Sequence, residues 1–170
     1  MQRTEWFNRK FPVIDDNGIL PSIIERLIGT PARIEEITAH LEPAILTLKP
    51  RGKWSIKEEI GHLCDLEPLW LGRLHDLING EPELRVTDLT NQKTHNANHN
   101  ATPLKTLQQS FREQRQLLVN ELLSLDDAQL LNSSLHPRLK TPMRIIDLAY
   151  FVAEHDDHHL AGVREIIQKR

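Results

Sequence analysis

The stretch IIDLAYFVAEHDDHHLAGVREI, residues 145–166, contains the repeat that decides the fold. Its core-type positions recur at alternating intervals of three and four residues, the period of a helix face turned toward a bundle interior. Two of these positions hold histidine where packing alone would favour an apolar residue. The seam consists of Ile145, Leu148, Val152, His155, His159, Gly162 and Ile166. The pattern predicts a long amphipathic helix over residues 142–168, with two imidazoles on its core-facing side.

The same helical period recurs in three earlier segments, residues 31–41, 55–79 and 103–124. A shorter helical stretch is expected before the first of them, with a break or bend at Gly29 and Pro31. Four long amphipathic helices joined by loops are most simply arranged as a bundle. The sequence therefore predicts an all-α fold, a four-helix bundle.

Helix-start signals precede each of these segments. Thr-Pro pairs begin at Thr30, Thr102 and Thr141. Threonine can cap the free N–H groups of a first turn, and proline in that turn loses no hydrogen bond. The fourth start, Ser55 to Glu58, fits the capping box, in which serine and glutamate satisfy each other's backbone donors.

Composition places the chain among single-domain globular proteins. Its 170 residues suit one domain, with residues 1–19 as an N-terminal extension. The formal net charge of −3 gives no basic surface for nucleic acid. We also expect no membrane span, because the sequence has no apolar run long enough. The one cysteine excludes an intrachain disulfide and fits a cytoplasmic location.

The connection at residues 80–101 is polar, rich in asparagine and long for a bundle loop. Such loops are more often functional, or crossover connections, than accidental. We expect a lid or a substrate wall here. The segment holds a second pair of histidines spaced by four, His95 and His99, which we set aside as ligands because regular helix is not expected around them.

A metal site is the functional hypothesis that the histidine pattern supports. His155 and His159 project from one helix face about 6 Å apart along the axis, a separation that two imidazoles can close onto one ion. The facing helix, residues 55–79, offers His62 at the edge of its apolar face. Three neutral imidazoles leave coordination positions open, as in catalytic sites. The alternative is that all three are hydrogen-bonded core residues.

Carboxylates near these histidines can orient an imidazole or move a proton. The candidates are Glu58, Asp65, Asp156 and Asp157, with Glu58 as the possible base. His158 is expected to be solvated or to support the pair beside it. The remaining side chains with reactive or aromatic groups are interpreted as surface residues (His40, His75 and His136) or as packing residues (Cys64, Trp54 and Trp70).

Two stretches resemble the DinB-like (YfiT-type) superfamily. In GKWSIKEEIGHLCDLEPLWLGRL, residues 52–74, Trp54 precedes His62 by the eight residues that separate the family's tryptophan from its first metal histidine. AYFVAEHDDHHLAGVREI, residues 149–166, is similar to the closing His-x-x-x-His motif of that family. RLIGTPARIEE and HPRLKTPMRIIDLA also have family-like counterparts, so the resemblance extends from about residue 20 to residue 168.

The resemblance implies a four-helix bundle, usually a homodimer, with a divalent metal ion bound by His62, His155 and His159. Zinc, nickel, iron and manganese all suit the family. Its members include metal-dependent hydrolases and S-transferases that use a low-molecular-weight thiol, such as bacillithiol or mycothiol. We therefore expect a metal-dependent enzyme that activates water or a thiol toward a small-molecule substrate. Two alternatives stay open: a non-catalytic metal-binding bundle acting as a sensor or binding module, and a bundle with no metal.

Overall fold

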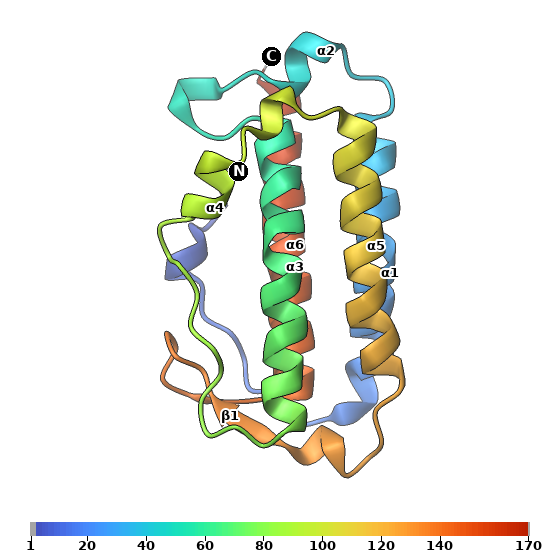
Figure 1. The fold of residues 1–170 in the computed structure, drawn as a ribbon, viewed down its shortest axis with the longest axis vertical. Coiled ribbons are helices and arrows are strands. Elements are labelled where there is room, and N and C mark those ends of the chain that lie inside the picture. The colour runs from blue at the N-terminus through green and yellow to red at the C-terminus, as the bar shows by residue number, and fades with distance from the viewer. Residues whose placement is uncertain (1–2, 170) are drawn as a thin grey trace.

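A computed structural model describes residues 3–169 of the chain, without the side chain of Arg51. Four long helices stand side by side (Figure 1). They are α1 (Leu20–Thr38), α3 (Ile56–Ile78), α5 (Leu104–Leu123) and α6 (Ile145–Gln168). Helices α1 and α3 each pack against both α5 and α6. The predicted all-α four-helix bundle is confirmed.

The connections give the bundle an uneven topology. Helices α3 and α5 run in the same direction, because residues 79–103 return along one side of the bundle before α5 begins (Figure 1). This crossover segment contains α4 (Gln92–Asn96) and a short 3-10 turn, η4 (His99–Ala101). The N-terminal segment begins on the same side with η1 (Trp6–Asn8) and then crosses the lower end of the bundle, where η2 (Asn17–Ile19) leads into α1 (Figure 1). The expected crossover is therefore present.

Small elements close the ends of the bundle. Helix α2 (Pro43–Leu46) and η3 (Pro50–Gly52) connect α1 to α3, and η5 (Gln129–Leu131) follows α5. Two short antiparallel strands, β1 (Ser133–Leu135) and β2 (Pro142–Arg144), lead into α6. In the described part of the chain, no helix combines the length and apolarity that crossing a membrane requires.

Helix α6 confirms the seam that the sequence predicted, since all seven of its positions are buried. The apolar ones pack into two clusters that together run the length of the bundle. His155 and His159 lie where these clusters meet polar side chains, and they are 3% and 7% exposed. The repeat therefore carries two imidazoles into the interior.

One buried arginine touches all four long helices. Arg115, on α5, is 1% exposed. Its guanidinium donates to both oxygens of Glu67 on α3, at 2.6 and 3.1 Å, and to both oxygens of Asp156 on α6. It also lies 3.4 Å from the carbonyl oxygen of Leu27 on α1. Thr30 of α1 donates to Asp156 as well, at 2.9 Å. Buried charges are tolerated only when they are paired in this way.

The predicted break at Gly29 and Pro31 is wrong, because α1 continues through both residues. A proline inside a helix frees the carbonyl oxygen four residues earlier, which here is that of Leu27. Arg115 donates to this oxygen and replaces the missing partner. The predicted start at Thr30 is wrong for the same reason: the helix already begins at Leu20.

The last helix begins at Ile145, three residues later than predicted. The Thr141-Pro142 pair does not start it, since Pro142 belongs to β2 and pairs with Leu135. The carboxylate of Asp147 accepts the backbone N–H of Arg144 at 2.9 Å and caps the first turn instead. Strand pairing thus overrides a local helix-start signal.

His136 was expected at the surface, but it is 2% exposed. Its Nδ1 atom accepts the backbone N–H groups of Arg138 and Leu139, both at 3.1 Å. The ring therefore organises the turn between β1 and β2. Its other nitrogen, Nε2, lies 3.1 Å from a guanidinium nitrogen of Arg73 on α3.

Replacing Arg115 by methionine is expected to destabilise the bundle strongly, because two carboxylates then stay buried without a cation. Breaking a buried pair from one side costs about 3–5 kcal/mol. The matched control is Arg112→Met, one turn earlier on α5, whose partner Glu35 is 43% exposed. We expect that change to cost no more than about 1 kcal/mol. Urea unfolding measures both, and equal losses would contradict the role given to Arg115.

Acid is expected to weaken the fold through His136. Burial, reinforced by the guanidinium groups of Arg73 and Arg138, lowers the pKa of His136 to about 4. An unfolded histidine titrates near about 6.5. The contribution of the neutral ring is therefore complete above about pH 6.5. It is lost as the pH falls from about 6.5 toward about 4, because over this range the unfolded chain takes up the proton more readily than the folded one.

The control variant for this pH dependence is His136→Asn, whose side-chain oxygen can still accept hydrogen bonds from the N–H groups of the turn. We expect the free energy of unfolding to fall more steeply for the wild type than for His136→Asn between about pH 7 and about pH 4. The other histidines titrate in both proteins and cancel. Parallel curves would show that His136 does not resist protonation.

Candidate metal centre

Three buried histidines meet between α3 and α6. His62 comes from α3, and His155 and His159 come from α6. One nitrogen of each ring lies within 4.8 Å of the other two. The three histidines predicted as ligands from the sequence therefore lie close together. His62, at the edge of the apolar face of α3, faces the α6 seam that holds His155 and His159.

A chain of hydrogen bonds fixes the tautomer of His62. Its Nδ1 lies 3.0 Å from the hydroxyl oxygen of Thr94, in α4. Thr94 donates its own hydrogen to Oδ2 of Asp65 at 2.9 Å, so the hydroxyl accepts the Nδ1–H of His62. The same Asp65 oxygen accepts Nε2–H of His99 at 2.8 Å. The lone pair of His62 therefore resides on Nε2.

His159 is oriented by a carboxylate of α3. Its Nδ1–H donates to Oε2 of Glu59 at 2.5 Å. Glu59 is itself buried, at 7% exposure, and its other oxygen lies 3.9 Å from the guanidinium of Arg3. Carboxylate–histidine pairs of this kind fix the ring and raise the basicity of the opposite nitrogen. The lone pair of His159 is left on Nε2.

The nitrogens of His155 complete the arrangement. Nε2 of His155 lies 3.1 Å from Nε2 of His159. Nδ1 of His155 is buried and has no hydrogen-bond partner among the described residues. Its ring lies between Trp6 and Trp70, with centroids 4.9 and 5.5 Å away. Nitrogens this close repel each other unless a proton or a cation lies between them, so the donor set suits a metal ion.

Burial keeps the rings of His62 and His155 neutral, the form in which imidazole binds metals. Burial, reinforced by the neighbouring histidines, lowers the pKa of His62 to about 2 and that of His155 well below its ordinary value. Burial and the nearby Arg3 lower the pKa of His158 to about 3. At neutral pH His62 and His155 therefore offer lone pairs rather than positive charge.

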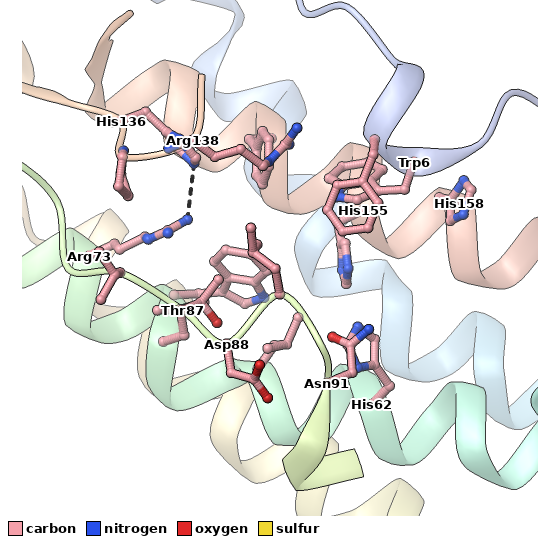
Figure 2. Close-up of a pocket in the computed structure, with 18 of the residues that line it drawn as sticks. Trp6, His62, Arg73, Thr87, Asp88, Asn91, His136, Arg138, His155 and His158 are labelled. Atoms are coloured by element: carbon pink, nitrogen blue, oxygen red, sulfur yellow. Dashed lines mark hydrogen bonds between the residues drawn. The ribbon is translucent and has the colours of Figure 1, made fainter. Parts of the chain in front are cut away.

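A cavity of about 280 Å³ opens beside the three histidines. Figure 2 shows His62, His155 and His158 at one end of it, and Arg73, His136 and Arg138 at the other. Its wall is largely apolar and comes from α3, α6, the N-terminal segment, the crossover segment and the turn after β1. The apolar lining consists of Trp6, Phe7, Trp54, Leu66, Leu69, Trp70, Val86, Leu89, Pro137 and Phe151.

Glu58, the carboxylate singled out from the sequence as a possible base, is engaged elsewhere. One of its oxygens accepts the backbone N–H of Ser55 at 2.8 Å, and the other accepts from Lys49 at 2.8 Å. The predicted capping box is confirmed, and it occupies this side chain. The structure places Glu59, its neighbour, beside the histidines instead.

Of the other candidate carboxylates, one supports the cluster and two belong to ion pairs. Asp65 reaches His62 through Thr94. Asp156 pairs with the buried Arg115. Asp157 pairs with Arg26 and Arg33 of α1, at 2.5 and 2.7 Å.

Sequence reasoning missed three side chains that orient the cluster: Glu59, Thr94 and His99. A signal for Glu59 was present, because it lies three residues before His62 on the same helix face, while the capping box already accounted for Glu58. Thr94 and His99 belong to the crossover segment, whose path no local pattern specifies. His99 belongs to the pair, His95 and His99, that was not expected to bind metal. Its contact with Asp65 shows that it supports the cluster without being a ligand.

A glycine makes the approach of His99 possible. A Cβ atom at Gly61 would lie 2.3 Å from Cγ of His99, so only glycine lets that ring lie against α3.

The cavity wall also includes two residues interpreted differently from the sequence. Trp54, expected in the core, contacts His62 with ring centroids 4.6 Å apart. His158 also lines the cavity.

Comparison with solved structures finds YfiT from Bacillus subtilis, described as a probable metal-dependent hydrolase with an unusual four-helix bundle topology. The match has a TM-score of 0.81 at 18% sequence identity, and it covers 95% of this chain and 93% of YfiT. A search of curated proteins returned no match. The family profile of the DinB superfamily matches residues 26–162, which confirms the resemblance: this chain belongs to the DinB superfamily.

Proposed function

We propose that this protein is a metal-dependent enzyme in which His62, His155 and His159 hold one divalent ion. The observation that carries the proposal is the convergence of three buried imidazole nitrogens beside a cavity. A divalent ion bound there would lower the pKa of a coordinated water or thiol, which supplies a nucleophile near neutral pH. Zinc, nickel, iron and manganese all accept imidazole ligands.

The residues around the cluster hold it ready for such a role. Thr94 and Glu59 keep the Nδ1 protons of His62 and His159, so that both rings present Nε2. Trp6 and Trp54 cover the cluster and limit the access of water. Preformed ligands spare the site the cost of reorganisation when the ion binds.

The adjoining cavity favours an enzyme over a metal site that only stabilises the fold. Structural metal sites are closed by four protein ligands, whereas this cluster has three and borders a space of about 280 Å³. That volume suits a small-molecule substrate. A metal-binding module without turnover is the alternative.

Hydrolysis and thiol transfer are both compatible with this arrangement. The probable metal-dependent hydrolase activity of the structural neighbour supports hydrolysis. For thiol transfer the thiol must come from a cosubstrate, because Cys64 contacts Ser110 and Gln114 of α5 and does not line the cavity. Burial also raises the pKa of Cys64, which disfavours the thiolate.

Metal content is expected to depend on the histidine cluster. Wild-type protein expressed in metal-replete medium should carry about one ion per chain, and His155→Ala should lose most of it, because two imidazoles bind far less tightly than three. His95→Ala is the matched control, since His95 is exposed and belongs to the other histidine pair. Elemental analysis measures the ion. An unchanged content in His155→Ala would contradict the site.

Turnover distinguishes the enzyme from the binding module. The metal-loaded protein should act on one of two panels: esters and amides with water, or electrophiles with a low-molecular-weight thiol. Activity that survives in full in His62→Ala would reject the proposed chemistry. Stoichiometric metal with no turnover on either panel would favour the binding module.

Gly61→Ala is expected to weaken metal binding without touching a ligand. The added Cβ displaces His99 and so loosens the chain through Asp65 and Thr94 to His62. Loss of such supporting contacts typically costs 10- to 100-fold in metal affinity, and we expect a loss of about that size. Competition with a chelator of known affinity measures it.

The control for this change is Gly29→Ala, because nothing lies within 4 Å of a Cβ built at Gly29 in α1. Alanine is normally favoured over glycine inside a helix by about 0.5–1 kcal/mol. Gly29→Ala should therefore keep the metal affinity and gain a little stability. The same result for Gly61→Ala would show that His99 does not support the cluster.

A further inference from the structure

The end of the cavity opposite the histidine cluster holds a buried positive charge without a carboxylate partner. Arg73 is 2% exposed, and it forms no ion pair among the described residues. Asp76, whose charge acts on Arg73, is occupied by Arg85, which donates to both its oxygens at 2.6 and 2.9 Å. Burial lowers the pKa of Arg73 to about 10, which still leaves it charged at neutral pH.

The contact between Arg73 and His136 lacks an acceptor. A neutral imidazole has one nitrogen that accepts and one that donates. In His136 both nitrogens face donors: Nδ1 faces the N–H groups of Arg138 and Leu139, and Nε2 faces Nη1 of Arg73 at 3.1 Å (Figure 2). Whichever nitrogen of His136 carries the hydrogen, that N–H group points at another N–H donor. An acceptor placed between His136 and Arg73 removes this conflict.

A second guanidinium reaches the same end of the cavity. Arg138 lies over the ring of Phe7, 5.3 Å from its centroid. Its Nη2 atom is buried and has no hydrogen-bond partner among the described residues. Buried donors without partners are costly and uncommon in folded proteins. Nε of Arg73 donates to the carbonyl oxygen of Arg85 at 3.1 Å. The contact between Arg73 and His136 and the Nη2 atom of Arg138 still leave N–H donors without an acceptor at this end of the cavity.

The residues that line the cavity offer little negative charge to balance the guanidinium groups of Arg73 and Arg138. Asp88 is the acidic side chain among the described residues that line the cavity. It is exposed, and its carboxylate accepts the backbone N–H groups of Thr90 and Gln92 at 2.8 and 2.6 Å. The described wall therefore offers these buried donors no free carboxylate.

We propose that Arg73, His136 and Arg138 form a subsite for an oxyanion, a carboxylate or phosphoryl group, at the far end of the substrate. The assignment rests on the proposed function in one respect, since it takes the histidine cluster as the reacting end. Guanidinium groups bind both kinds of oxyanion through paired N–H donors. The substrate is therefore a small molecule with a reactive group at one end and an anionic group at the other.

Helix α3 sets the spacing between the two ends. His62 and Arg73 are eleven residues apart on the same face, which corresponds to about 16 Å along the axis. The long Arg73 side chain leans toward the N-terminus of its helix and shortens the gap. Leu66, Leu69 and Trp70 line the cavity between them. The middle of the substrate is accordingly apolar.

The first test needs no metal. Chelator-treated full-length protein is unfolded by heat in sodium chloride, in sodium succinate and in sodium phosphate at equal ionic strength. We expect succinate or phosphate to raise the unfolding temperature of the wild type and of Arg112→Met, but not of Arg73→Met. Arg112→Met removes the same charge from a surface pair on α5. Equal shifts in all three proteins would overturn the subsite.

The second test places a probe across both ends. Cobalt-loaded protein is titrated with ω-mercaptoalkanoates of increasing chain length, the matching ω-mercaptoalkylphosphonates and the uncharged ω-mercaptoalkanols, and the thiolate-to-cobalt absorption band reports binding. At one chain length an anionic tail should improve the affinity about tenfold or more over the alkanol. Arg73→Met should abolish that preference and leave the alkanol affinity unchanged, whereas Arg112→Met should keep it.

The outcomes separate the two proposals. Alkanols that bind the cobalt, with no gain from an anionic tail at any length, would overturn the subsite and leave the metal site in place. A protein that binds no cobalt would contradict the proposed function, and the metal-free unfolding test then decides on the subsite alone. The preferred tail, carboxylate or phosphonate, identifies the kind of oxyanion.

Discussion

The buried guanidinium of Arg115 is the constraint on which the rest of the structure depends. It joins α5 to Glu67 of α3, Asp156 of α6 and a carbonyl of α1. Since the charges are enclosed, the helices can slide or rotate only by breaking pairs that water does not replace. Asp156 adjoins His155 in the chain, so the contacts that fix the bundle also fix the helix that carries two of the three histidines.

The histidine cluster and the opposite end of the cavity each lack a binding partner, and the two missing partners have opposite character. At one end, two imidazole nitrogens lie 3.1 Å apart and need a proton or a cation between them; at the other end, N–H donors face one another. Each arrangement is unfavourable by itself in a buried place, and each is relieved by a ligand of the opposite character, a cation or an oxyanion. Strain of this kind is typical of functional sites, whose stability is supplied by the surrounding packing.

The sequence predicted the features that follow from periodicity and from family resemblance. The helical seam of α6, the capping box at Ser55 and the meeting of three histidines were all foreseeable. Glu59 was overlooked beside Glu58 on the same turn. Thr94, His136 and Arg73 could not be assigned, because their roles depend on where the crossover segment and the β turn lie against the bundle. The continuity of α1 through Pro31 is supported by an arginine from another helix, a tertiary contact that local propensity does not contain.

In the proposed site, the bundle holds three imidazoles ready for one metal ion at the end of the cavity. Anomalous diffraction from crystals of the metal-loaded protein tests it most directly. We expect one strong anomalous peak, from an ion bound by Nε2 of His62, His155 and His159, with its open coordination positions toward the cavity. A peak at other residues, or a loaded crystal in which these three rings bind no ion, would contradict it.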